Sequence, residues 1–563
     1  MMRGRVMWRW VMVVSMAALA ASCGDEGSDG GEVGGDEVGE SGVSTVVPDG
    51  KADDYFSTVG QEYTVTGETF AVVDAGCLEE NAEAPMGAET VCKLRSVGLK
   101  NFAIGWILNQ YIIDKHDSDN EDWGGFTAMT RPESFMGLET SALDEDGRFT
   151  YTFTSELSGP LDLLDVMPVK PCEGQAGQCF TLEVPVLDNA TLAKTETGSE
   201  WYRSAPFNAY DPGTYTGEKE SLALRIEAYP RSNDAFLEYN KLFSDAQLAK
   251  AGGKLRIGVF VGWDYYEDRY DLQTAKEVYR WLVDEQGFKS PVESYDDYGI
   301  ASGELTKTIQ VEGREVEVEA ILVHPGQGDP ADPGFAGQMK EAMVKAFTER
   351  QIIIYEGHAG PLYGFALANW RSTEAGELDD SELPLLDIPS DFYQVVLASG
   401  CDTYMVADSL YAIPVKSGRV DLDVITTSSF SNAAGRGRTS KALMGAVINQ
   451  DDQGQLRPTT YGKLLRELNR EWYMTPIYGV HGIDDNPRAN PFADPTRLCQ
   501  PCGGHGECGG DDNLCLQLND AEAVCGVLCK VDDDCPQDFA CFKVADADTI
   551  FASQCVPKGL TCQ

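Results

Sequence analysis

Two stretches, QIIIYEGHAG at residues 351–360 and QVVLASGCDT at residues 394–403, decide the predicted fold of this chain. Each begins with uncharged and largely β-branched residues, a composition typical of a buried strand in a parallel sheet. Each then ends in glycine and polar residues, so His358 lies just past the first strand and Cys401 just past the second. Open α/β sheets build their sites at the carboxyl ends of such strands. The sequence therefore predicts that His358 and Cys401 share one edge of a sheet.

These two residue types suit nucleophilic catalysis. A thiol with its ordinary pKa of about 8.5 is only a few per cent thiolate at neutral pH, so a nearby imidazole is needed to activate it. His358 precedes Cys401 by 43 residues, and the histidine of caspases lies about 50 residues before the cysteine. The pair, with an apolar run before each member, resembles the catalytic dyad of the caspase-like cysteine peptidases (caspases, metacaspases, gingipains, legumains and separases).

The resemblance implies that Cys401 is the nucleophile, that His358 handles the proton, and that backbone N–H groups at Gly357, Ala359 and Cys401 stabilise the oxyanion. The sequence departs from the family at two points. His358 is followed by Ala359 before Gly360, and Cys401 stands in ASGCDT rather than after the Gln-Ala of caspases. With alanine in place of glycine at position 359, the backbone N–H after the histidine can still donate to the oxyanion if Ala359 adopts the required φ and ψ angles.

The expected substrate is a protein or peptide, and we expect neither a cofactor nor a metal. Asp264 and Asp402 lie where an acid could reach a basic P1 side chain, and the acidity of the chain favours Lys or Arg at P1. Two alternatives stay open. The fold could serve as a non-catalytic binding scaffold on a surface lipoprotein, or the same dyad could act on a non-peptide substrate.

The predicted caspase-like domain spans residues 254–475, after a helical linker at residues 232–253. Strands are expected at residues 255–262, 318–323 and 420–426, in addition to the two that carry the dyad. Leu272, Ala275 and Val278 share one face of a predicted helix, and Met339 and Met343 share a face of another at residues 335–350. The order of strands and helices predicts a mostly parallel sheet with helices on both faces. The resemblance itself covers residues 254–450.

The amino terminus predicts export. Residues 1–22 have the basic start and short apolar run of a signal peptide. LAASC at residues 19–23 resembles a bacterial lipobox, which implies lipidation at Cys23; ordinary cleavage nearby is the alternative. Residues 23–54 are rich in Gly, Asp, Glu and Ser and are predicted to form a flexible acidic tether. The protein is expected at the outer membrane or cell surface, or else secreted.

The chain is strongly acidic, with 91 Asp and Glu against 44 Lys and Arg and a net charge of −47. Nucleic acids and anionic lipid surfaces are polyanions, so this charge argues against both as partners. It carries no information about oligomeric state.

Cysteine positions divide the chain into groups. With Cys23 assigned to lipid, four cysteines lie in the amino-terminal half and ten follow from residue 499 onward, and both even sets can pair in an oxidising compartment. We predict a Cys172–Cys179 loop, a possible Cys77–Cys92 bridge, and five disulfides in a module at residues 499–563. Cys401 is the cysteine that remains. It is interpreted as the nucleophile, and a buried cysteine acting as a small hydrophobe is the alternative.

The remaining segments are less informative. Residues 55–231 predict a β-rich, sandwich-like domain whose role as a prodomain, a binding module or a spacer stays open. The acidic residues 117–122 are interpreted as a solvated loop rather than a Ca²⁺ site, because they lack the glycine and final glutamate of an EF-hand. Residues 476–498 predict a Pro-rich linker. His481 follows the cysteine and His324 ends a strand, so both are interpreted as structural.

Overall fold

The structure is a computed structural model, and it describes most of the chain beyond residue 54. The described residues are 55–84, 87–116, 129–130, 140–161, 163–197, 201–228, 239–360, 364–379, 382–416, 421–428, 431, 435–450, 454–469, 478–482, 497–503, 508, 513–519, 522–529, 532, 535–545 and 551–562. The predicted signal peptide, the lipidation site at Cys23, the tether and the acidic loop at residues 117–122 lie outside them.

A seven-stranded sheet forms the centre of the chain, with the order β16-β15-β14-β10-β7-β9-β8. Neighbouring strands among β7, β9, β10, β14 and β15 are parallel, whereas β8 and β16 run antiparallel to their neighbours at the two edges. The bounds are β7 (Lys254–Val261), β8 (Leu305–Val311), β9 (Arg314–Val323), β10 (Ile352–Glu356), β14 (Gln394–Ser399), β15 (Leu422–Thr427) and β16 (Tyr478–His481).

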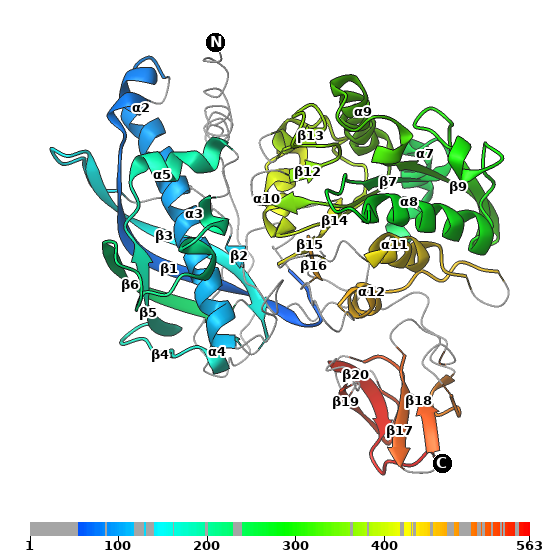
Figure 1. Ribbon diagram of the computed structural model, residues 1–563. Helices are drawn as coiled ribbons and strands as arrows, with labels where there is room; N and C mark the ends of the chain where they lie inside the picture. The colour runs from blue at the N-terminus through cyan, green and yellow to red at the C-terminus, as the bar shows by residue number, and fades with distance from the viewer. Residues whose placement is uncertain are drawn as a thin grey trace, which may run out of the picture.

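Helices cover both faces of this sheet (Figure 1). On one face lie α8 (Tyr270–Arg280), α11 (Arg438–Ile448) and α12 (Tyr461–Leu468), which share a buried apolar cluster with Ile352 and Ile354 of β10. On the other face lie α9 (Pro333–Glu349) and α10 (Val406–Tyr411), whose cluster includes Ile353 and Tyr355. Alternate residues of β10 therefore enter opposite cores, which explains why the strand is apolar throughout.

The predicted mixed α/β architecture is confirmed in this part of the chain. The expected strands are present, and Met339 and Met343 of α9 are buried in the core as the helical spacing indicated. The sheet extends further than predicted, because β16 falls within the segment interpreted as a linker from residue 476. Its four residues include Gly479 and His481 and carry too short an apolar pattern to predict a strand.

The amino-terminal part contains a six-stranded antiparallel sheet with the order β2-β3-β1-β6-β5-β4. Its longest strands are β1 (Gly60–Val72), β3 (Arg148–Pro160), β5 (Gln178–Pro185) and β6 (Lys219–Ala228), and the shorter ones are β2 (Met129–Thr130) and β4 (Lys170–Pro171). The long helix α3 (Ala88–His116) packs against this sheet, and α5 (Asn189–Ala193) packs on α3 (Figure 1). The described residues thus form a sheet-and-helix layer structure, and the prediction of a sandwich was wrong.

Helix α3 was missed because its sequence lacks an amphipathic pattern. Residues 97–109 are buried all round, between the sheet on one side and α5 on the other. A helix covered on both sides needs no polar face, and its β-branched and aromatic residues resemble those of a strand. Tertiary packing against the sheet and α5 therefore outweighs the preference of these β-branched and aromatic residues for a strand.

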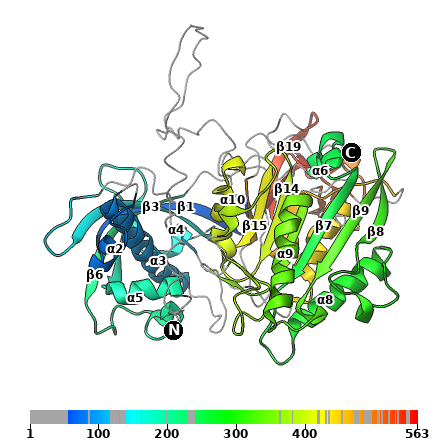
Figure 2. The same ribbon diagram turned by 90° about the horizontal axis from the view of Figure 1, so that it is seen from above.

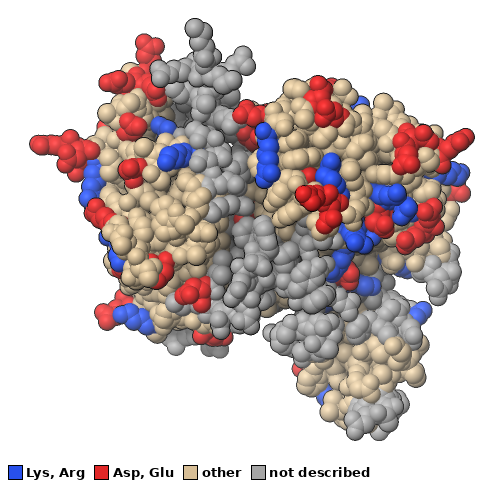
Figure 3. Space-filling view, in the orientation of Figure 1, with Lys and Arg blue, Asp and Glu red and all other residues tan. Residues whose placement is uncertain are grey.

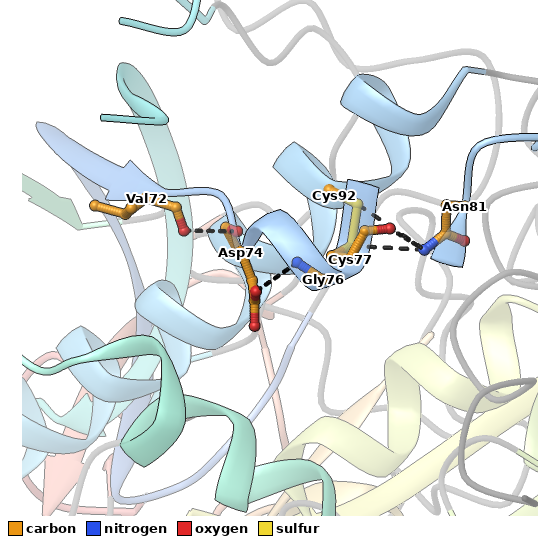
Figure 4. Close-up of a disulfide and its surroundings, with 7 residues drawn as sticks. Val72, Asp74, Gly76, Cys77, Asn81 and Cys92 are labelled. Atoms are coloured by element: carbon orange, nitrogen blue, oxygen red, sulfur yellow. Dashed lines mark hydrogen bonds between the residues drawn. A yellow bond between two sulfur atoms is a disulfide. The ribbon is translucent and has the colours of Figure 1, made fainter. Parts of the chain in front are cut away.

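The predicted amino-terminal disulfides are both present. Cys77–Cys92 joins α2 (Ala75–Glu80) to α3, and Cys172–Cys179 closes a short loop before β5. Around the first bridge, the side chain of Asp74 accepts a hydrogen bond from Gly76 N at 2.8 Å, which caps α2 (Figure 4). The bridge therefore fixes a short helix that has little stability of its own.

The carboxyl-terminal module consists of two hairpins, β17 (Cys515–Asn519) with β18 (Glu522–Cys525) and β19 (Phe539–Ala545) with β20 (Phe551–Pro557). Five disulfides cross-link it, as predicted: Cys499–Cys562, Cys502–Cys515, Cys508–Cys525, Cys529–Cys541 and Cys535–Cys555. The disulfides of the chain indicate an oxidising environment. Within the described residues, no helix has the length and apolar character needed to span a membrane.

Candidate active site

His358 and Cys401 occupy equivalent positions past the ends of adjacent parallel strands. The register of β10 and β14 runs from Ile352 opposite Val395 to Glu356 opposite Ser399. Each dyad residue follows two positions after the last pair, and the N–H of Gly357 continues the pairing by donating to Ser399 O at 3.0 Å. The structure therefore brings the two predicted residues to the same edge of the sheet.

Glycines allow this edge to pack closely. Gly262, Gly357 and Gly400 follow β7, β10 and β14, respectively. A Cβ added at Gly357 would lie 2.7 Å from the Cα of Gly262, and one added at Gly400 would lie 2.5 Å from the Cβ of Ala359. These distances are too short for real carbon atoms. Glycine at these positions lets the backbone beside His358 contact the backbone beside Cys401.

Asp264 holds the imidazole of His358. The Nε2 of His358 lies 3.0 Å from Asp264 Oδ1. The carboxylate also accepts hydrogen bonds from Tyr266 N at 3.2 Å and Tyr270 N at 3.1 Å, and its side chain is 4% exposed against 22% for His358. Burial raises the pKa of Asp264, but the hydrogen bonds from His358 and Tyr266 outweigh it and the pKa is lowered overall. An ionised Asp264 thus orients the ring of His358 through Nε2.

Aromatic rings surround His358. Tyr265 stacks on its imidazole, with centroids 4.6 Å apart and planes 19° apart. The guanidinium carbon of Arg371 lies 4.3 Å from the centroid of Tyr265 and 4.9 Å from that of Trp370. Burial is the largest cause that raises the pKa of Tyr265, and its hydrogen bond with Tyr266 adds to it.

The hydroxyl group of Tyr355, in the preceding strand β10, fixes the backbone at His358. The hydroxyl of Tyr355 donates to the carbonyl of His358 and accepts from Ala366 N at 3.1 Å. Tyr355 is fully buried in the sheet, and burial raises its pKa, so the hydroxyl stays protonated as a donor. The short strands β11 (Ala359–Gly360) and β12 (Gly364–Ala366) then carry the chain away from the site.

Cys401 retains its thiol, whereas the other cysteines in the described part of the chain form disulfides. The residue is 9% exposed, and its Sγ lies 3.9 Å from Ser431 Oγ. The next residue, Asp402, has a φ of +54°, in the left-handed region that non-glycine residues adopt only at a cost. Thr403 secures this turn, since its hydroxyl donates to Ala398 O at 2.6 Å.

The predicted oxyanion donors have different outcomes. The N–H of Gly357 is engaged in the sheet bond to Ser399 O, so this donor is removed from the predicted set: a donor held by a carbonyl cannot bind the oxyanion as well. Ala359 has no positive φ, so its backbone conformation is open to alanine and the departure from glycine causes no strain. The assignments of Ala359 and Cys401 as donors stay predictions.

The two acids predicted to bind a basic P1 side chain are both buried. Asp264 is 3% exposed and contacts His358, and Asp402 is 1% exposed beside Cys401. The sequence placed Asp264 correctly at the end of β7 but missed its contact with His358. A signal for that role was available, because an acid just past the strand adjacent to β10 lies at the same sheet edge as His358.

The other described histidines are held in structural contacts, although His324 follows β9 at the same edge of the sheet, two strands from β10. His324 Nδ1 accepts from Gly326 N at 3.2 Å, and its Nε2 lies 3.4 Å from the hydroxyl of Tyr295. His481 Nε2 lies 2.9 Å from Thr426 Oγ1 in a fully buried position. The described structure does not include His505 or the side chain of His116.

Two clusters of cysteine sulfurs in the carboxyl-terminal module have a spacing that could suit a metal, Cys502 with Cys508 and Cys525, and Cys529 with Cys535 and Cys555. All six belong to disulfides. A disulfide sulfur is not the thiolate that zinc requires, so these residues do not form a zinc site.

The support for this site comes from its geometry and not from similar proteins. No protein-family model, curated protein or solved structure matches this chain.

Proposed function

We propose that the protein is an exported caspase-like cysteine endopeptidase with His358 and Cys401 as its catalytic dyad. The observation that carries the proposal is the pairing register of β10 and β14, which brings the imidazole and the thiol to equivalent positions at one sheet edge. The carboxylate of Asp264 on His358 Nε2 adds the third group that such a site uses to orient its base.

In this mechanism the thiol of Cys401 loses its proton to His358 and attacks the scissile carbonyl. A thioester forms as the peptide C–N bond breaks, and the imidazolium gives its proton to the leaving amine. Water then hydrolyses the thioester. The N–H groups of Ala359 and Cys401 stabilise the oxyanion, and Asp264 stabilises the imidazolium. Asp264 contacts His358 and Asp402 is only 1% exposed, so the preference at P1 is left to the peptidyl probes and is not assigned to either acid.

The cellular location is proposed from two sources. The disulfides indicate an oxidising environment, and the lipobox-like sequence before Cys23 supports a lipid anchor at the bacterial outer membrane or cell surface. Asp and Glu side chains are distributed over the described parts of the face shown in Figure 3, with Lys and Arg among them. This surface and the net charge of −47 support a protein or peptide substrate over nucleic acid.

The dyad is tested with the full chain and thiol-directed peptidyl probes that carry Lys, Arg or Asp at P1. The wild-type chain should be labelled at Cys401, and hydrolysis of the matching peptide should follow the same P1 preference. C401A should abolish both. C401S is the matched control for shape, since it keeps the side-chain volume but lacks the thiolate. Undiminished labelling of C401A, or labelling at another residue, would contradict the proposal.

A second function, a binding scaffold without catalysis, is supported by the burial of Cys401, which is only 9% exposed. A nucleophile must be reached by the scissile carbonyl, and a buried thiol is more typical of a packing residue. The scaffold requires that the wild-type chain hydrolyse none of a broad set of peptides while C401A keeps its stability. Hydrolysis that depends on both Cys401 and His358 would exclude it.

A further inference from the structure

The loop that follows Cys401 contacts the amino-terminal sheet directly. Tyr404 belongs to the short helix η9 (Thr403–Met405) and is 0% exposed. Its hydroxyl donates to the carboxylate of Glu62 in β1, a residue that is 5% exposed. Figure 2 shows β1 running from the amino-terminal sheet toward α10 and β15. A buried hydrogen bond to a side-chain carboxyl oxygen therefore joins the two parts of the chain three residues after Cys401.

An aromatic cluster surrounds this bond. The ring of Tyr404 lies 5.7 Å from that of Tyr55 at 76° and 5.1 Å from that of His481 at 55°. Tyr55 precedes β1, whereas His481 belongs to β16, and their rings are 4.9 Å apart. A Cβ added at Gly479 would lie 2.1 Å from Tyr55 Cζ, so the tyrosine ring rests on the backbone of β16. The next residue, Phe56, pairs with Val480 of β16, so the segment that leads into β1 is anchored on the α/β sheet beside Tyr404.

A chain of hydroxyl groups extends the contact to a second loop of the site. Ser158 of β3 donates to the hydroxyl of Tyr55 at 2.9 Å, and Ser428 donates to Ser158 Oγ at 2.6 Å. Ser428 comes directly after β15 and stands three residues before Ser431, whose Oγ lies 3.9 Å from the Sγ of Cys401. The amino-terminal part therefore touches the loops on both sides of the thiol.

The turn at Cys401 needs such support. Asp402 adopts a left-handed conformation, which persists only where the surroundings hold it in place. On the α/β side, the hydroxyl of Thr427 donates to Gly400 O at 2.6 Å and Thr427 N donates to Thr403 Oγ1 at 2.9 Å. These bonds hold the start of the turn, and the bond from Tyr404 to Glu62 holds its end.

We infer that Glu62 and Tyr404 are positioning residues for the Cys401 loop, and that the amino-terminal β-rich part is an integral component of the active site. The catalytic part of this inference rests on the proposed function. The inference also assigns a role to the amino-terminal part, which the sequence left open among a prodomain, a binding module and a spacer. Loss of the Tyr404–Glu62 bond should let the loop open locally, which exposes the thiol and moves it out of its catalytic position.

The test uses full-length Y404F and E62Q, with Y411F as the matched control. Y404F removes only the hydroxyl, whereas E62Q keeps a carbonyl oxygen that can accept from Tyr404. Tyr411 of α10 donates to Leu422 O at 3.0 Å and is 6% exposed, so Y411F also removes a buried hydroxyl bond, one that is made within the α/β part. A general loss of stability affects Y404F and Y411F alike.

Two readouts do not depend on peptidase activity: the rate of Cys401 alkylation by iodoacetamide, and amide hydrogen exchange. In Y404F we expect alkylation to rise about tenfold or more and exchange to rise selectively at residues 400–405. E62Q should stay close to wild type, and Y411F should change neither readout in this segment. If the wild-type chain hydrolyses peptides, kcat should fall in Y404F with little change in KM, because the substrate contacts remain.

The outcomes separate this inference from the proposed function. Alkylation and exchange in Y404F equal to those in Y411F would overturn the inference, whatever the peptidase assay shows. Selective opening in Y404F together with no hydrolysis by the wild-type chain would support the positioning contact and count against the peptidase proposal.

Discussion

Asp264 orients the imidazole ring of His358 in the candidate site. It accepts two backbone N–H groups as well as the imidazole, so the acid is held rigidly and holds the ring in turn. In D264N the amide keeps the shape of the side chain but loses the charge that stabilises an imidazolium. We expect kcat to fall by roughly two orders of magnitude or more, with KM little changed.

The measurement for D264N is steady-state hydrolysis of the peptide substrate that the probes identify. D268N is the matched control, because Asp268 lies four residues away on the exposed surface and its carboxylate accepts a hydrogen bond from the hydroxyl of Tyr270 at 3.0 Å. A kcat for D264N within a factor of about two of the D268N value would show that orientation by Asp264 contributes little.

His324 makes the stability of the fold depend on pH. Burial lowers its pKa to about 4, below the ordinary value of about 6.5 for an unfolded chain. Between these values the unfolded chain binds a proton that the folded chain excludes. The free energy of unfolding therefore falls as the pH drops from about 6.5 toward about 4, by up to about 3 kcal/mol in total.

H324N tests this dependence, because an asparagine oxygen can still accept from Gly326 N but does not titrate. Urea unfolding at about pH 7 and about pH 4.5 should show a smaller loss of stability on acidification for the variant than for the wild type. Equal losses in the two proteins would mean that His324 does not carry the dependence.

At the scale of elements, one carboxylate joins a strand to a helix. Glu356 ends β10, and its Oε2 accepts hydrogen bonds from Thr439 Oγ1 at 2.8 Å and Ser440 Oγ at 2.7 Å. Its Oε1 accepts from Gly437 N at 3.1 Å, the residue that precedes α11. A negative charge at a helix N-terminus complements the helix dipole, so Glu356 both caps α11 and fixes it near His358.

E356A should lower the free energy of unfolding by about 2–3 kcal/mol, because it removes a charged acceptor from several buried donors at once. E341A, at an exposed position of α9, is the control and should change it by no more than about 0.5 kcal/mol. Chemical denaturation measures both. A similar small change in the two variants would show that other groups satisfy the start of α11.

For the whole molecule, the large negative charge opposes compactness. Ion pairs such as Lys254–Glu317 at 2.9 Å and Lys250–Asp391 at 2.7 Å act in the other direction. Salt screens both effects. The net charge of −47 exceeds what a few local pairs can offset, since exposed pairs each contribute only about 0–1 kcal/mol.

We therefore expect the melting temperature to rise by a few degrees, roughly, between about 10 mM and about 300 mM NaCl. Calorimetry or fluorescence measures the shift, and an uncharged osmolyte at the same osmolality separates screening from exclusion effects. A melting temperature that falls with salt would mean that ion pairs outweigh the repulsion.

Sequence patterns were enough to predict the strands that carry His358 and Cys401, the mixed α/β architecture around them, the two amino-terminal disulfides, and the number but not the pairing of the disulfides in the carboxyl-terminal module. These features are encoded locally. Residues 352–355 and 395–398 are apolar because both faces of their strands are buried, and a separation of seven residues brings Cys172 and Cys179 within bonding reach. Local patterns of this kind can be recognised in the sequence before the tertiary structure is known.

The contacts between side chains that are far apart in the sequence are known only from the folded structure. The contact of Asp264 with His358 spans 94 residues and that of Glu62 with Tyr404 spans 342. The long helix α3 was invisible for the same reason, because its polar face is absent where other elements cover it. Packing between distant segments sets these features, and no local pattern of apolar and polar residues records which distant segments will pack together.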